Sequence, residues 1–224
     1  MKLFHWRRFY SQICLILVVG LGGCQVLPDW VIVAAPTAAP SGTVLFSDDF
    51  SQVPNGWGLS ESANAAVAYE RDGLRILVGQ PGKDAWSVAG RKFADVDLAV
   101  SVRRLSGPVN NMIGLICRYQ DSSNFYLAFV STDGYYGIAR IEQDSFHLIS
   151  AKELQYSSFL AGLEAEFQLQ ALCSRDLLAL FANGQPLAQV RDSTFGMGDV
   201  GVFAGSYDQP GVDIVFDNFT VKQP

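Results

Sequence analysis

Apolar and polar residues alternate along most of the chain from Thr43 to the C-terminus. Leu98, Val100 and Val102 alternate with small or polar residues, and residues 167–173 repeat the pattern. A period of two residues is typical of β-strands that bury one face. No segment has the pattern of a long amphipathic helix, and residues 160–165 are expected to form one short turn at most. We therefore expect one all-β domain of roughly twelve to fourteen strands.

Short Gly-containing pairs separate these strands. Asn183-Gly184 lies between two apolar runs and predicts a tight hairpin, because both residues accept a positive φ. Asp72-Gly73 and Asp133-Gly134 are expected to form two more turns. So many regularly spaced strands favour a sandwich of two antiparallel sheets. The first and last strands are expected to pair, which would bring Phe50 and Phe219 into one core.

The N-terminal segment has a different pattern. Three basic residues are followed by nine mostly apolar residues at 13–21 and then by Leu21-Gly22-Gly23-Cys24. This is the anatomy of a secretory signal, with an apolar run too short to span a bilayer permanently. Its last four residues resemble the bacterial lipoprotein signal, which implies cleavage before Cys24 and attachment of lipid to its thiol. The alternatives are an ordinary signal peptide cut near Ala34 or Ala35 and, because of Arg7-Arg8, a twin-arginine signal.

These patterns divide the chain into three parts. Residues 1–23 are predicted to be a lipoprotein signal peptide, residues 24–42 a lipidated cysteine with a Pro- and Ala-rich tether, and residues 43–224 the β-sandwich domain. The domain is expected at the cell envelope, held to a membrane by lipid and facing outside the cytoplasm. The choice between inner and outer membrane stays open, as does the oligomeric state.

The net negative charge of the chain argues against two classes of partner. The formal net charge is −6, and without residues 1–23 the chain keeps 13 basic and 22 acidic residues. Such a surface repels nucleic acid and anionic lipid head groups. No nucleic-acid partner is expected.

The four cysteines also fit an exported protein. Apart from Cys14 and Cys24, Cys117 and Cys173 remain, each on the apolar side of an alternating strand. Outside the cytoplasm such a pair tends to oxidise, so we predict a Cys117–Cys173 disulfide. The alternative is two separate buried thiols.

Several segments together resemble the concanavalin A-like lectin/glucanase sandwiches, and most of all the domain named for 3-keto-disaccharide hydrolases, which is related to family 16 glycoside hydrolases. The similar segments are 48–50, 114–121, 124–126, 133–136, 181–184, 198–201 and 216–219. The resemblance implies a jelly-roll fold whose curved sheet can hold a saccharide. Active family 16 enzymes carry Glu, Asp and Glu at alternating positions of one strand, and this sequence has no such strand. The acidic pairs Glu164/Glu166 and Asp95/Asp97 are interpreted as solvated surface.

Saccharide sites combine flat aromatic faces with a few polar groups. If Cys117 points inward, then Arg118 points outward. The same alternation buries Phe125, Leu127 and Phe129 and turns Tyr126 outward. The predicted ligand-binding surface comprises Arg118, Tyr126, Tyr136 and Arg140, with Trp86 on a neighbouring strand. The alternative is that these residues merely cover an exposed sheet.

Three aspartates are a candidate calcium site. Asp48, Asp49 and Asp217 would meet where the first and last strands pair, and their oxygens suit that ion. The alternative is turn hydrogen bonding, and no other cofactor is expected.

The leading functional hypothesis is recognition of carbohydrate or another cell-surface ligand without catalysis. The alternatives are a glycoside hydrolase or lyase of the 3-keto-disaccharide type and a structural module that contacts a protein.

Overall fold

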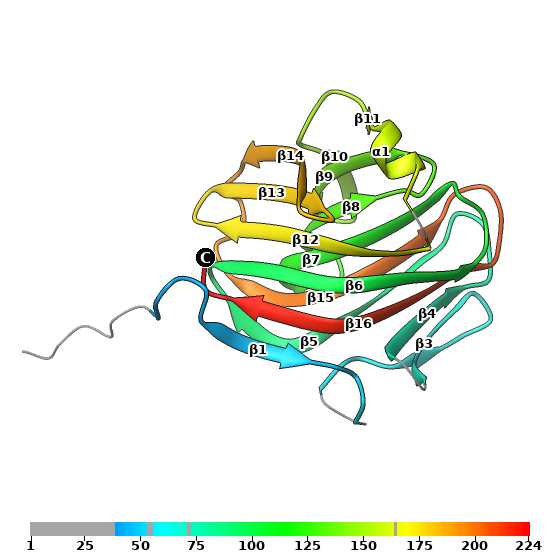
Figure 1. The fold of residues 1–224 in the computed structure, drawn as a ribbon, viewed down its shortest axis with the longest axis horizontal. Helices are drawn as coiled ribbons and strands as arrows, with labels where there is room; N and C mark the ends of the chain where they lie inside the picture. Colours follow the sequence, from blue (N-terminus) through cyan, green and yellow to red (C-terminus); the bar gives the residue numbers. More distant parts are fainter. Residues whose placement is uncertain (1–38, 53–55, 71–72, 164) are drawn as a thin grey trace, which may run out of the picture. The chain divides into compact units, whose positions relative to one another are not determined.

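The computed structural model describes residues 39–224 except 53–55, 71–72 and 164. Two antiparallel sheets lie as two layers (Figure 1), which confirms the predicted jelly-roll β-sandwich. Residues 1–38, with the predicted signal peptide, Cys24 and most of the tether, lie outside the described residues. Within the part of the chain that is described, no helix is both long and apolar enough to cross a membrane.

Among the described residues, one sheet has nine strands and the other has seven. In spatial order, the nine-stranded sheet comprises β14 (Gln185–Arg191), β13 (Leu177–Ala182), β12 (Glu166–Ser174), β6 (Val96–Ser106), β16 (Val212–Lys222), β4 (Gly73–Val78), β3 (Ala65–Glu70) and β2 (Ser60–Glu61), with β1 (Val44–Asp48) also pairing with β16. The seven-stranded sheet comprises β10 (Ser145–Leu148), β9 (Tyr135–Glu142), β8 (Asn124–Val130), β7 (Asn111–Asp121), β15 (Gly198–Ser206) and β5 (Asp84–Phe93), with β11 (Gln155–Tyr156) pairing with β9. The described residues also form one short helix, α1 (Ser158–Ala161).

The main hydrophobic core lies between the sheets. The alternating apolar residues of β6 and β12 are buried in it, as their sequence pattern predicts. Cys117 of β7 and Cys173 of β12 form the predicted disulfide, which joins the two sheets. The described residues of this core lie between residues 46 and 221, and residues 39–224 form one compact unit. We expect this unit to fold without the preceding residues.

The local predictions at the hairpin and at the terminal strands are also confirmed. Asn183 and Gly184 connect β13 to β14 with φ of 45° and 75°, as a type I′ turn requires. The first strand, β1, pairs antiparallel with the last, β16. Trp57 packs between Phe50 and Phe219, with both ring-centroid distances 5.0 Å. This aromatic group closes one side of the core.

A second apolar cluster covers the other face of the seven-stranded sheet. Its buried members are Ile116, Phe125, Leu127, Phe129, Ala139 and Phe203. β8 is therefore apolar on both faces, because Tyr126, Ala128 and Val130 pack into the main core. Alternation of apolar and polar residues cannot orient such a strand.

Candidate functional site

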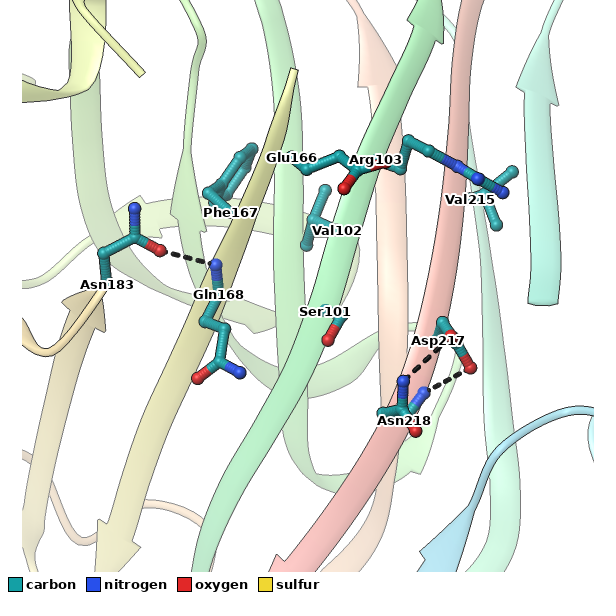
Figure 2. A pocket seen from close by; sticks show the side chains of 10 residues that line it. All are labelled: Ser101, Val102, Arg103, Glu166, Phe167, Gln168, Asn183, Val215, Asp217 and Asn218. Atoms are coloured by element: carbon teal, nitrogen blue, oxygen red, sulfur yellow. Dashed lines mark hydrogen bonds between the residues drawn. The ribbon is translucent and has the colours of Figure 1, made fainter. Parts of the chain in front are cut away.

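A pocket of about 430 Å³ lies on the outer face of the nine-stranded sheet. Figure 2 shows side chains of β12, β6 and β16 around it, together with Asn183 of the β13–β14 hairpin. Its volume falls within the range of about 300–1,000 Å³ that small-ligand sites occupy. We call it the sheet pocket, and its lining residues are Ser101, Val102, Arg103, Glu166, Phe167, Gln168, Asn183, Val215, Asp217 and Asn218.

Strand register places six of these side chains in two rows that run across the strands. Glu166 pairs with Arg103, and Arg103 pairs with Val215. Two residues further along, Gln168 pairs with Ser101, and Ser101 pairs with Asp217. Side chains two residues apart on a strand share a face, so both rows point outward. In Figure 2 the Arg103 side chain extends from β6 towards Val215 on β16.

Local features explain the hollow between the rows. The central strand, β6, presents the small side chains of Ala99 and Ser101 on this face. The residues that pair with them on the neighbouring strand β12, Gln170 and Gln168, have longer side chains. On the other side, β16 bulges between Asp217 and Thr220, and Asn218 there has a φ of 52°. A bulge redirects side chains, which fits the presence of both Asp217 and Asn218 in the pocket lining.

The pocket is rich in planar polar groups. Asn218 donates from its backbone N to Asp217 Oδ1 at 2.7 Å and from its Nδ2 to Oδ2 at 2.8 Å, which holds that carboxylate in place. Asn183 Oδ1 accepts a hydrogen bond from the Gln168 backbone N at 2.7 Å. The side-chain amide of Gln168 is exposed and makes no hydrogen bond to the described residues, so it can serve a ligand. Phe167 is buried, so this pocket lacks an exposed aromatic platform.

The predicted outward orientation of Arg118 and Tyr126 is wrong, because each side chain is only 1% exposed. Tyr126 lies on the inner face of β8, and Phe125, Leu127 and Phe129 lie on its outer face, which reverses the expected orientation. Because both faces of this strand are apolar, its sequence pattern does not distinguish them. At Arg118 the strand itself is irregular. Its φ is 53°, and the pairing of β7 with β8 shifts register between Cys117 and Asp121. Simple alternation from Cys117 therefore fails at the next residue.

Both side chains hold the connection between β14 and β15. Arg118 donates from Nη1 to the Phe195 carbonyl at 2.8 Å and from Nε to the Ala94 carbonyl at 3.1 Å. The Tyr126 hydroxyl donates to Asp192 and accepts a hydrogen bond from the Phe195 backbone N at 3.0 Å. The fork of donors on an arginine suits this anchoring of backbone carbonyls. These two residues stabilise a loop from inside the sandwich.

Arg140 of β9 joins the same network, and Tyr136 lies four residues before it on the same face of that strand. Arg140 is half-buried and forms ion pairs with Asp192 and with Glu142, the latter at 3.0 Å. Burial raises the pKa of Tyr126 to about 12, and the hydrogen bond to Asp192 adds to the rise. Burial alone would raise the pKa of Asp192, but hydrogen bonds from Tyr126 and Thr194 and the charge of Arg140 bring it below its usual value. Tyr136 packs partly buried against the core.

Trp86 lies on the opposite face of the seven-stranded sheet from these residues. Its ring stacks on Phe203 at a centroid distance of 6.3 Å and an interplanar angle of 9°. The five residues predicted to share one ligand-binding surface are therefore divided between the two faces of this sheet.

The three aspartates of the candidate calcium site have separate local partners. Asp48 accepts hydrogen bonds from the Phe50 backbone N and from Trp57 Nε1, and Asp49 accepts from Ser51. Asp217 is held by Asn218. Among the described residues, no three His, Cys, Asp or Glu side chains form a group that could hold a metal ion. The structure thus does not bring these carboxylates together.

Sequence reasoning missed most of the sheet pocket. It names Asp217 only as a calcium ligand and assigns Glu166 to solvated surface, and it does not select Arg103, Gln168 or Asn218. The available signal was the polar half of the alternation in residues 98–103 and 167–173. The alternation does not predict that β12, β6 and β16 are neighbours in the sheet.

No protein-family model matches the sequence, and no curated protein matches it. Among solved structures, the chain is similar to the carbohydrate-binding module CBM66 from Bacillus subtilis, with a TM-score of 0.59 and 18% identity over 75% of this chain and 96% of that one. It is also similar to a Bacillus subtilis protein of unknown function with a galectin-like fold, with a TM-score of 0.59 and 13% identity over 82% and 97% of the two chains. A third similar structure is the β-glucanase of Bacillus licheniformis, with a TM-score of 0.55 and 11% identity over 83% and 100%. These likenesses show the jelly-roll β-sandwich fold.

Proposed function

We propose that this protein binds carbohydrate without cleaving it, and that lipid on Cys24 holds it to a membrane on the side away from the cytoplasm. The observation that carries the binding role is the sheet pocket, whose two rows contain mostly hydrogen-bonding side chains. The similar fold of a carbohydrate-binding module supports it.

The chemistry of the sheet pocket suits hydroxyl groups. A saccharide hydroxyl both donates and accepts, so it needs acceptors and donors in one place. Glu166 and Asp217 supply carboxylate acceptors, while Gln168 and Asn218 supply amides that can do both. Hydrogen bonds to charged groups are stronger than those between neutral groups, which favours this pocket over a neutral surface.

Binding without hydrolysis is proposed because the sequence lacks the strand with Glu, Asp and Glu at alternating positions that active family 16 enzymes carry. Glu166 and Asp217 instead lie two strands and two residues apart.

The proposed anchor rests on the sequence of residues 1–24. Two or more acyl chains give stable membrane attachment, since each buried methylene contributes about 0.8 kcal/mol. The disulfide between Cys117 and Cys173 fits a location in an oxidising compartment. Metabolic labelling with a radioactive fatty acid tests the anchor: label should enter the wild type and be absent from Cys24→Ala. Equal labelling of both proteins would refute lipidation at Cys24.

A glycan array probed with residues 39–224 tests the binding role. We expect saturable binding to at least one glycan, unchanged by EDTA, with no cleavage product when that glycan is incubated with the protein. Gln168→Ala and Asp217→Asn should each weaken binding about tenfold or more, because the first removes an amide from the pocket and the second removes the charge of a carboxylate acceptor. Gln185→Ala is the matched control, since Gln185 is an exposed glutamine of β14 outside the pocket lining.

Three results would contradict the proposal. Binding to no glycan by the folded domain would remove the carbohydrate role. Equal losses in Gln168→Ala and Gln185→Ala would place the site elsewhere. Cleavage of the bound glycan, lost in Asp217→Asn, would make the protein a hydrolase or lyase.

A further inference from the structure

A second cavity, of about 220 Å³, lies at one end of the seven-stranded sheet. It is bounded by the segment before β7, the turn between β8 and β9, the residue before β11 and the segment after β15. We call it the turn cavity. None of its lining residues belongs to the sheet pocket, which lies on the other sheet.

Aromatic rings form much of the wall of the turn cavity. Phe129 is 1% exposed, whereas Tyr135 and Tyr207 are 43% and 42% exposed. The cavity thus has one fully packed ring and two rings at its surface. The faces of aromatic rings carry partial negative charge, so they attract cations within about 6 Å of the ring centre.

Asp133 is the one charged residue in the lining of the turn cavity. Its Oδ1 is inaccessible to solvent and has no hydrogen-bond partner among the described residues. No ion pair to a described residue neutralises it. Burial of a carboxylate that no ion pair neutralises costs free energy, and a cation bound beside it in the cavity would offset that cost. Burial and then the charge of Asp133 raise the pKa of Tyr207, which agrees with Asp133 and Tyr207 lying near each other.

The turn that carries Asp133 is held firmly to the first residue of β7 and to the segment before it. Asn111 donates from Nδ2 to Thr132 Oγ1 at 2.7 Å and accepts from the Thr132 backbone N at 3.1 Å. Ser131 Oγ donates to the Val109 carbonyl at 3.1 Å. Asp133 is therefore positioned before any ligand arrives, which lowers the entropy cost of binding.

We propose that the turn cavity binds a protonated amine. Its ammonium group donates a hydrogen bond to Asp133 and packs against the rings of Phe129, Tyr135 and Tyr207. A protonated amine meets both requirements of the cavity, a positive charge for the carboxylate and the rings and an N–H donor for the second carboxylate oxygen, Oδ2. This site goes beyond the proposed carbohydrate role and does not depend on it.

Isothermal titration calorimetry of the full chain with n-butylammonium tests the proposal. 1-Butanol, which has the same carbon chain without the charge, is the matched ligand control. We expect saturable binding of n-butylammonium and none of 1-butanol. Asp133→Asn and Tyr207→Ala should each weaken binding by about tenfold or more, since one removes the counter-charge and the other removes a ring.

Glu153→Gln is the matched protein control. It removes the same charge from an exposed residue next to Leu154, which lines the cavity, and it should leave affinity within about twofold of the wild type. Thermal unfolding shows whether each variant is folded, and the exposure of Tyr207 makes its substitution well tolerated. Competition with glucosamine and with glucose identifies the source of the amine. Displacement by glucosamine alone indicates an amino sugar, and displacement by neither indicates a simple alkylamine.

Several results would overturn the proposal. They are no heat of binding with n-butylammonium, equal binding of 1-butanol, undiminished binding by Asp133→Asn, and displacement by glucose as effective as that by glucosamine. The last result would make the turn cavity a site for neutral saccharides.

Discussion

The hydroxyl of Tyr126 donates a hydrogen bond to the carboxylate of Asp192, across the gap between β8 and the loop that follows β14. The same oxygen accepts the backbone N–H of Phe195. One buried side chain therefore satisfies two groups of the β14–β15 connection. Arg118 supports the same connection through the Phe195 carbonyl. The residues that looked like a ligand surface in the sequence are thus used to fix a loop.

Tyr126→Phe should lower the free energy of unfolding by about 2 kcal/mol, because it removes one hydrogen bond to Asp192 and leaves the Phe195 N–H without a partner. Chemical denaturation measures the change. Tyr156→Phe is the control, since Tyr156 is 57% exposed and should change stability by less than about 0.5 kcal/mol. Equal effects of the two substitutions would show that the Tyr126 hydroxyl does not stabilise the loop.

Stability should fall in acid partly through Asp192. Its pKa is lower in the folded protein than in the unfolded chain, where an aspartate titrates near about 3.9. Its contribution is therefore fully present above that pH and is lost as the pH falls through the lower, folded-state pKa. Asp192→Asn should be less stable at neutral pH and should show a flatter acid limb in urea unfolding between about pH 5 and pH 2. An unchanged slope would exclude this linkage.

Reduction of the disulfide should destabilise the domain. Cys117 and Cys173 are 56 residues apart, and closing such a loop stabilises the folded state by about 4 kcal/mol in the chain-entropy model. Cys117→Ala combined with Cys173→Ala should show a loss of this size in denaturant unfolding. A reducing agent should destabilise the wild type and leave the double variant unchanged. If the reducing agent does not change the unfolding free energy of the wild type, this result would argue against the disulfide.

Substitution of two nearby glycines by alanine should change the stability of the protein by very different amounts. A Cβ at Gly198 would lie 2.4 Å from the backbone carbonyl carbon of Arg118, so Gly198→Ala forces β15 away from β7. We expect a loss of about 3 kcal/mol in unfolding free energy. Nothing lies within 4 Å of a Cβ at Gly196, so Gly196→Ala should change stability by less than about 0.5 kcal/mol. A mild effect at Gly198 would mean that the two strands can separate without cost.

The sequence by itself determined the features that depend on local pattern. Alternation in residues 98–103 and 167–173 predicted two strands and their buried faces. Asn183-Gly184 predicted a hairpin because few residue pairs accept its backbone angles. The inward parity of Cys117 and Cys173 predicted the disulfide. In each case the information lies within a few residues of the feature.

Only the tertiary structure decided which surfaces can bind a ligand. β8 is apolar on both faces, so its sequence could not say that Tyr126 points inward. The irregular backbone at Arg118 and at Asn218 changes which way side chains point, and alternation has no signal for it. The sheet pocket joins residues of β12, β6 and β16, which are adjacent only because strands far apart in the chain pair. Pairing between distant strands is set by packing of the whole sandwich, and no local pattern contains it.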